Sequence, residues 1–211
     1  MTSKTPTKTE LAPTTLAQVT GGNGANRVMG TNGSEYTDTG YGNDTVLAGG
    51  GNDTVKAGAD KDSVAGQAGD DTIHGGDGID QLFGNAGRDT INGGAGSDLI
   101  IGGTGADVLN GDDGWGVQGE DLFRWHPGDG NDTINGGGGT DILALEDTGL
   151  SLQQLLTTIN ETGTTQARIE GNSINLTGVT GSITIGNETI HFSQMERLVI
   201  GSYQYLSGRR E

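Results

Sequence analysis

The sequence predicts an all-β protein that is built as a stack of short, repeated strands. Three observations lead to this prediction: an uninterrupted nine-residue period, one aliphatic residue at a fixed place in each period, and 42 glycines among 211 residues. Glycine at this density without a G-X-Y period is not collagen, and its regular spacing argues against disorder. Because a single unit of this length buries almost nothing, the units have to stack on one another.

The repeat favours glycine at positions one, two and four, aspartate at position six and an aliphatic residue at position eight. The aspartates at position six are Asp44, Asp53, Asp62, Asp71, Asp80, Asp89, Asp98 and Asp107. The aliphatic residues at position eight are Val46, Val55, Val64, Ile73, Leu82, Ile91, Ile100 and Leu109. The frame extends back without a slip, with Asn26 and Glu35 at position six. Residues 21–110 are therefore predicted to form ten units, of which the first two are degenerate.

Each favoured residue type has a physical role in such a unit. Glycine tolerates positive φ and lets backbone carbonyl groups point into a tight turn. A carboxylate beside those carbonyl groups supplies hard oxygen ligands, which suit Ca²⁺ rather than a transition metal. The aliphatic residue, with mostly polar neighbours, indicates a very short strand with one inward side chain.

The segments "GGAGSDLII" (93–101) and "GGTGADVLN" (102–110) show the repeat almost unaltered. This pattern resembles GGxGxDxUx, the calcium-binding nonapeptide of the RTX or haemolysin-type proteins. The resemblance implies a right-handed parallel β-roll in which two units make one coil and Ca²⁺ lies in the turns. It also implies that an ion bridges successive coils.

With two units in each coil, aspartates 18 residues apart are expected to share an edge of the roll. One edge then carries Asp44, Asp62, Asp80 and Asp98, and the other carries Asp53, Asp71, Asp89 and Asp107. Bridging ions between them predict about six bound Ca²⁺ or more. The expected metal ligands are these eight aspartates together with Asp132 and Asp141.

The register fails after Asn110, and residues 111–145 are predicted to be interrupted closing repeats. Within them Asp121, Asp132 and Asp141 return to position six. The aromatic residues Trp115, Phe123 and Trp125 are interpreted as a hydrophobic plug over the open end of the roll. A solenoid needs a cap of this kind over its terminal repeat.

Glycine becomes sparser from Glu146, and residues 146–211 are predicted to form a small β-rich C-terminal cap. The stretch 151–159 suggests a short amphipathic helix. Strands are expected in the alternating segments "SINLT", "SITI" and "TIHF" and in "MERLVIG".

Position nine predicts two different outer faces. One series is apolar and the other polar: Leu47, Ala65, Phe83 and Ile101 against Lys56, His74, Asn92 and Asn110. An apolar row is rarely left bare on a soluble monomer. We expect residues 146–206 to fold back over it; the alternative is self-association or a partner site.

The net charge of the chain and its lack of known catalytic motifs exclude several classes of function. The formal net charge is −17, so the natural partners are cations rather than nucleic acid or anionic membranes. The chain has no cysteine. No apolar run is long enough to span a membrane. We find no HExxH, GxSxG or GxxxxGK[ST] motif, and we predict no enzyme.

Gly21-Gly22 follows Val19, Leu16 and Leu11 at a spacing that resembles double-glycine leaders, which peptidase-containing ABC exporters cleave. Residues 1–22 are therefore interpreted as a leader, although Thr15 stands where an acid is usual and Pro13 would break a helix. The alternative is that the two glycines only begin the repeat.

These observations predict a secreted, extracellular calcium-binding protein. Cytosolic Ca²⁺ is far below the affinity of extracellular calcium modules, which is about 10⁻⁴–10⁻³ M. The chain would therefore stay unfolded until an ABC-type exporter has released it, and then fold on Ca²⁺. The expected role is structural or adhesive. The alternatives are a calcium-dependent assembly module that uses the apolar face, or a small effector with its activity in residues 146–211.

Overall fold

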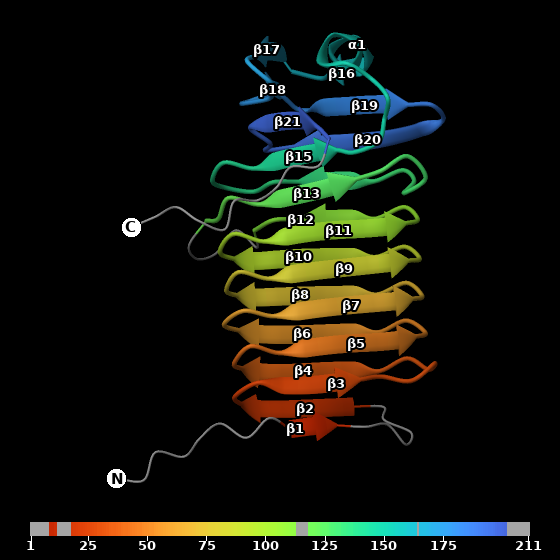
Figure 1. Cartoon of the computed structure of the whole chain (residues 1–211), viewed down its shortest axis with the longest axis vertical. Coiled ribbons are helices and arrows are strands. Elements are labelled where there is room, and N and C mark those ends of the chain that lie inside the picture. Colours follow the sequence, from red (N-terminus) through yellow and green to blue (C-terminus); the bar gives the residue numbers. More distant parts are fainter. Residues whose placement is uncertain (1–8, 12–17, 113–117, 164, 202–211) are drawn as a thin grey trace.

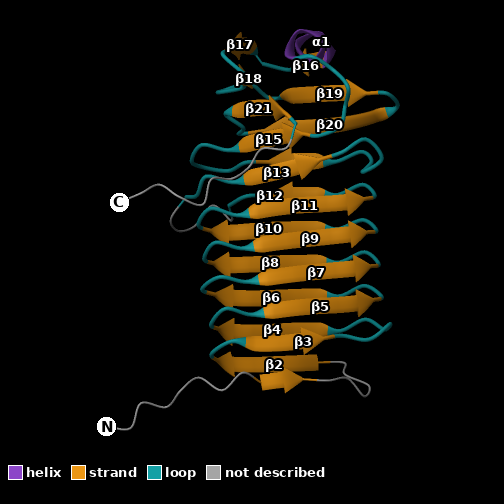
Figure 2. Cartoon of the chain, viewed as in Figure 1, coloured by secondary structure: helices purple, strands orange, loops and turns teal. Residues whose placement is uncertain are grey.

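The computed structural model describes residues 9–11, 18–112, 118–163 and 165–201 of the chain. Two sheets face each other along a single stack, which begins at β1 and β2 and ends at a small cap (Figure 1). Strands dominate, and one short helix lies at the cap end (Figure 2). The predicted parallel β-roll with a β-rich C-terminal cap is confirmed.

We call the two sheets sheet A and sheet B. In spatial order, sheet A contains β1 (Thr9–Leu11), β3 (Asn26–Met29), β5 (Thr45–Gly50), β7 (Ser63–Ala68), β9 (Gln81–Ala86), β11 (Leu99–Thr104), β13 (Leu122–Trp125), β15 (Ile142–Leu145), β21 (Arg197–Ile200), β18 (Ser173–Asn175) and β17 (Arg168–Glu170). Sheet B contains β16 (Ile159–Glu161), β19 (Gly181–Ile185), β20 (Glu188–Ser193), β14 (Thr133–Asn135), β12 (Val108–Asn110), β10 (Thr90–Ala95), β8 (Thr72–Asp77), β6 (Thr54–Ala59), β4 (Tyr36–Tyr41) and β2 (Gln18–Asn23).

The register shows that two repeat units make one coil. Val46 pairs with Val64, and Val64 pairs with Leu82, so strands 18 residues apart lie side by side and parallel. A full strand covers positions seven to nine of one unit and one to three of the next. Since side chains alternate along a strand, position eight points into the roll and position nine points out. The aliphatic residues at position eight are fully buried or nearly so, and they form the core.

The cap extends the same two sheets. β20 adds parallel to β14 and β21 adds parallel to β15, after which β17, β18, β19 and β16 pair antiparallel. The helix α1 (Leu152–Thr158) begins at Ser151 with a capping box to Gln154 and buries Leu155. The predicted helix and strands are thus confirmed. No helix in the described part of the chain is long and apolar enough to cross a membrane.

The expectation that the C-terminal segment folds back over the apolar row of position nine is wrong for the described residues. Residues 146–201 stack on the end of the roll instead (Figure 1). The reason is the backbone: β14 and β15 would otherwise leave their N–H and C=O groups open, and β20 and β21 pair with them. The row itself lies in register on sheet A, with its four side chains half-buried.

The interpretation of the aromatic residues as a terminal plug also needs correction. Phe123 and Trp125 are buried within the main core, and β13 has β11 on one side and β15 on the other. They fill the interior of the stack because the closing repeats continue the sheets, and the cap forms the end. The third member, Trp115, lies outside the described residues.

The glycine pair of the predicted leader lies inside a strand. Gly21 and Gly22 belong to β2, and Gly22 pairs with Gly40 of β4. Cleavage after Gly22 would remove most of this strand. Residues 1–8 and 12–17 of the predicted leader lie outside the described residues, so the leader stays a prediction.

Candidate metal centre

The carboxylates of position six line the two edges of the roll, where the turns join sheet A to sheet B. Each is almost completely buried, with at most 2% of the residue exposed. Its Oδ1 accepts a hydrogen bond from the backbone N–H of the position-six residue one coil earlier. The bond from Asp44 to Asp62 is 2.7 Å, and that from Asp62 to Asp80 is 2.8 Å.

These hydrogen bonds form two unbroken rows. The first contains Asp44, Asp62, Asp80, Asp98, Asp121 and Asp141. The second contains Asp53, Asp71, Asp89, Asp107 and Asp132. The structure thus places the eight aspartates of the two predicted edges in two rows as expected, and it adds the other two predicted ligands, Asp132 and Asp141, to these rows. It adds Asp121, which the repeat pattern put at position six but which the predicted ligand set omitted.

The second carboxylate oxygen of these residues has no such partner. Oδ2 is buried and without a hydrogen bond among the described residues in ten of them: Asp44, Asp53, Asp62, Asp71, Asp80, Asp89, Asp98, Asp107, Asp121 and Asp141. A backbone carbonyl oxygen lies in the same neighbourhood. A Cβ placed on Gly75 would lie 2.5 Å from both Asp80 Oδ2 and the Gly93 carbonyl oxygen. A buried anionic oxygen beside a carbonyl oxygen requires a cation or a proton.

Asn26 shows which kind of group pairs with the oxygens around a position-six side chain. It stands at position six of the first unit, where later units have aspartate. Its Nδ2 donates to the carbonyl oxygens of Gly24 at 2.7 Å and Thr39 at 3.3 Å, and to Asp44 Oδ1 at 3.1 Å. An amide nitrogen with partial positive charge therefore sits among three oxygens. Where aspartate replaces asparagine, the equivalent oxygens face a carboxylate, and the positive charge has to come from elsewhere.

Glu35 is the first position-six residue of the other row, and its side chain also has hydrogen-bond partners within the protein. It stands at position six of the second unit, and its backbone N–H donates to Asp53 Oδ1 at 2.7 Å. Its own carboxylate accepts bonds from the backbone N–H and the hydroxyl group of Thr31 in the same turn. Both degenerate units thus satisfy their position-six side chains with hydrogen-bond donors, whereas most of the later units do not.

Burial raises the pKa of the row carboxyls far above their ordinary value of 3.8. The pKa rises to about 6 for Asp53, Asp71, Asp80, Asp89 and Asp132, to about 7 for Asp62, Asp98, Asp107 and Asp141, and to about 8 for Asp121. The backbone hydrogen bond to Oδ1 lowers each pKa but does not cancel the burial. In many of them a neighbouring carboxylate of the same row raises it further.

The donor set fits Ca²⁺. Among the described residues, no three His, Cys, Asp or Glu side chains converge on one point, so a site here has to use backbone carbonyl oxygens as well. Carboxylate and carbonyl oxygens together are the ligands that Ca²⁺ prefers, whereas Zn²⁺ favours imidazole and thiolate. A bound ion would supply positive charge to the unpaired Oδ2 atoms.

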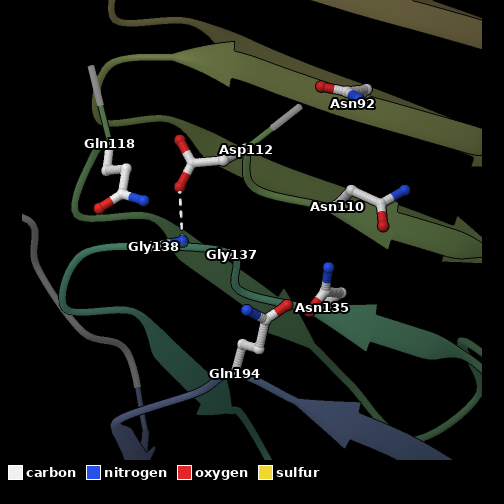
Figure 3. A pocket seen from close by; sticks show the side chains of 8 residues that line it. All are labelled: Asn92, Asn110, Asp112, Gln118, Asn135, Gly137, Gly138 and Gln194. Atoms are coloured by element: carbon white, nitrogen blue, oxygen red, sulfur yellow. Dashed lines mark hydrogen bonds between the residues drawn. The ribbon is translucent and has the colours of Figure 1, made fainter. Parts of the chain in front are cut away.

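The break in the repeat creates a second feature, a polar cavity of about 450 Å³ on the outer face of sheet B (Figure 3). Asn92, Asn110 and Asn135 lie in register across it. Asp112 Oδ2 accepts the backbone N–H of Gly138 at 2.8 Å. The lining consists of Asn92, Asn110, Asp112, Gln118, Asn135, Gly137, Gly138 and Gln194. These groups can hydrogen-bond a polar molecule, and this lining has no histidine or hydroxyl nucleophile.

A parallel solenoid with rows of buried, unpaired carboxylates defines a class of repeat protein whose turns take an oxygen-ligated cation. The sequence profile of the RTX calcium-binding nonapeptide repeat matches residues 38–73, 65–100, 74–109, 92–115 and 128–147. The chain therefore carries RTX calcium-binding nonapeptide repeats across residues 38–147.

Among solved structures, the chain is similar to the extracellular lipase LipA from Serratia marcescens, with 17% identity and a TM-score of 0.36 over 95% of this chain. The chain spans 41% of the length of that structure. No curated protein matches the chain.

Replacing Asn26 by aspartate is expected to create one more cation-dependent turn. The N26D variant would place an unpaired carboxylate among the Gly24, Thr39 and Asp44 oxygens. We expect folding of this variant to require more Ca²⁺ than folding of the parent, because an unpaired buried polar group costs about 2 kcal/mol, and we expect the folded variant to bind one more ion. A Ca²⁺ titration followed by far-UV circular dichroism and a bound-ion count measure the two effects. The matched control is N32D, the same change at an exposed turn residue. Equal behaviour of the two variants would contradict the assignment.

Without calcium, the folded roll is expected to lose stability as the pH rises from about 5.5 to about 8. The pKa values of the row carboxyls are higher in the folded state than the ordinary 3.8 of an unfolded chain, and they reach about 6 to 8 in all of them except Asp44, for which only the upward direction is established. The folded state therefore binds more protons across this range, and its stability declines as the pH passes through the folded pKa values. Far-UV circular dichroism in EDTA at the two pH values tests this, and a β-sheet signal that increases with pH is the opposite result. Calcium affinity should instead increase with pH, because the ion needs ionised carboxylates.

Proposed function

We propose that the chain is a secreted protein whose β-roll folds when Ca²⁺ binds outside the cell, and that the folded roll has a structural or adhesive role. The observation that carries the proposal is the set of ten buried Oδ2 atoms that have no hydrogen-bond partner within the described part of the chain. A folded roll at neutral pH would hold these charges against one another. Ca²⁺ in the turns would remove that repulsion. The free energy of Ca²⁺ binding would therefore stabilise the folded state.

The ligands in this proposal are the row carboxylates and the carbonyl oxygens of the neighbouring turns. Asp44, Asp53, Asp62, Asp71, Asp80, Asp89, Asp98, Asp107, Asp121, Asp132 and Asp141 would hold the ions, about six or more in number. Asp132 differs from the others because its Oδ2 is not among the unpaired atoms. We expect its turn to contribute the weakest site.

Secretion would follow type I export through an ABC-type transporter. Low cytosolic Ca²⁺ would keep the chain unfolded, and its net charge of −17 would keep it extended and soluble during passage. Cleavage after Gly22 would remove most of β2, the first strand of sheet B. The roll would keep its second strand in that sheet, β4, and the turn that Asn26 closes.

The proposal is tested by counting bound ions. Equilibrium dialysis of the full chain against radioactive Ca²⁺, with a large excess of Mg²⁺ as competitor, should give several ions per chain. The large, irregular oxygen cage of a carbonyl-rich turn suits Ca²⁺ better than the strict octahedron of Mg²⁺. A chain that binds no Ca²⁺ under these conditions would end the proposal.

A second function has one observation in its favour. The apolar row of Leu47, Ala65, Phe83 and Ile101 continues to Met29, which is 40% exposed. Such a row supports the alternative of calcium-dependent self-association through sheet A. Sedimentation of the F83S variant, with V108S on sheet B as the control, would separate this role from a monomeric one. Activity that survives deletion of the roll would favour the third candidate, an effector in residues 146–211.

A further inference from the structure

We propose that Glu196 of the cap and Asp141 of the last repeat together form one more divalent-cation site, beyond the repeats. This inference rests on the proposed binding of Ca²⁺ by the carboxylate rows. Glu196 lies 49 residues after the last residue of the RTX match, residue 147, and no repeat motif surrounds it.

The backbone register places Glu196 at the next rung of the first row. β21 pairs parallel with β15, with Ile142 opposite Arg197. Asp141 and Glu196 immediately precede these two strands and are therefore also opposite one another. The backbone N–H of Asp141 donates to Glu196 Oε2 at 2.8 Å, and that of Asp121 donates to Asp141 Oδ1 at 2.9 Å. Glu196 thus takes the role that an aspartate has in every earlier coil.

The unpaired oxygen of Asp141 supplies the second observation. Asp141 is completely buried, and its Oδ2 has no hydrogen-bond partner among the described residues. A Cβ placed on Gly136 would meet this Oδ2 at 2.6 Å and would overlap the carbonyl oxygen of Gln194. One coil earlier, a Cβ on Gly111 would overlap Asp121 Oδ2 and the Gly136 carbonyl oxygen. The same pair of oxygens therefore recurs at the junction with the cap.

The longer side chain of glutamate suits this junction. In a repeat, five residues separate the carbonyl of position one from the aspartate of position six, as from Gly93 to Asp98. In the cap, Gln194 precedes Glu196 by only two residues, and Gln194 adopts a left-handed φ of +50°. The extra methylene group of Glu196 lets its carboxylate reach the row from a shorter turn. Arg197 is directed elsewhere, because its Nη2 contacts Ser173 Oγ at 3.4 Å.

The ligand class is a hard divalent cation, since the site offers two carboxylates and one carbonyl oxygen. An ion there would join the last repeat to β21 and so make the packing of the cap depend on calcium. The cap would then be the calcium-fixed end of the stack, rather than an independently folded addition.

The E196Q variant tests the site, because glutamine removes the charge but keeps an oxygen that can accept the Asp141 N–H. The matched control is E170Q, the same change at an exposed cap residue whose carboxylate binds Arg168 and Asn175. Equilibrium dialysis against radioactive Ca²⁺ should show one ion fewer for E196Q and an unchanged count for E170Q. Hydrogen exchange of the β21 amides in saturating Ca²⁺ should be faster in E196Q alone.

A second variant covers the case in which E196Q does not fold. E196D keeps the charge but withdraws it by one methylene group. The last ion should then need about tenfold more Ca²⁺, at the low end of the affinity loss that follows changes to the groups that orient metal ligands. Unchanged ion counts and affinities in both variants would overturn the inference while leaving calcium binding by the rows intact. A parent chain that binds no Ca²⁺ would instead end the proposed function.

Discussion

In EDTA at about pH 8, the chain is expected to lose most of its β-sheet signal in far-UV circular dichroism, and added Ca²⁺ should restore it in one cooperative step. Ten buried Oδ2 atoms, for which residues 9–11, 18–112, 118–163 and 165–201 provide no hydrogen-bond partner, would otherwise carry negative charge in close rows. Each ion would neutralise carboxylates on successive coils, so the sites should fill together as the stack forms. This is the largest effect we predict.

Magnesium is the control for this experiment, because it demands near-ideal octahedral geometry and gives up its waters reluctantly. An equal concentration of MgCl₂ should restore little of the signal, and EDTA should reverse the effect of calcium. A chain that is already folded in EDTA at this pH, and indifferent to calcium, would contradict the mechanism. The roll would then be held by the aliphatic core alone.

The second large effect is expected for G96A, at position four of a repeat. Gly96 has a φ of +120°, a conformation that L-residues rarely adopt, and a Cβ there would overlap the carbonyl oxygen of Gly78 one coil earlier. Backbone strain together with overlap against a main-chain atom should cost about 3 kcal/mol or more. Urea unfolding in saturating Ca²⁺ measures the loss, and the calcium requirement for folding should rise with it.

Gly33 provides a matched control at the same position of an earlier repeat. It lacks a positive φ, and the nearest atom to a Cβ there would be Glu35 Oε1 at 3.6 Å, an ordinary contact. G33A should therefore unfold close to the parent midpoint. Equal losses in G96A and G33A would mean that the backbone conformation at position four does not limit the stack.

The repeat predicted most of the carboxylate rows, but it could not identify their ends. The first row begins with an asparagine whose amide meets three oxygens, and the pattern showed only that Asn26 was degenerate. It continues to Glu196, which the pattern could not register because its turn is shorter than a repeat. Both residues depend on neighbours that are distant in the sequence, so a local period carries no signal for them.

The placement of the cap was mispredicted for a related reason. The apolar row of sheet A led to the prediction that another segment packs over it, and residues 146–206 were chosen as that segment. Hydrophobic area alone, however, does not decide where a segment packs. The open edges of β14 and β15 offered a row of backbone hydrogen bonds to β20 and β21, and these strands continue the stack.

By itself, the sequence determined the length of the repeat and the inward position of the aliphatic residues, while the resemblance to the RTX repeats implied two units for each coil and aspartates in the turns. It could do so because each unit repeats the same local requirements, including glycine where a Cβ would overlap the next coil. Only the tertiary structure decided which oxygen of each carboxylate is satisfied, which donors close the first turns and which cap residue meets Asp141. These features arise from contacts between coils, and no single unit contains both partners.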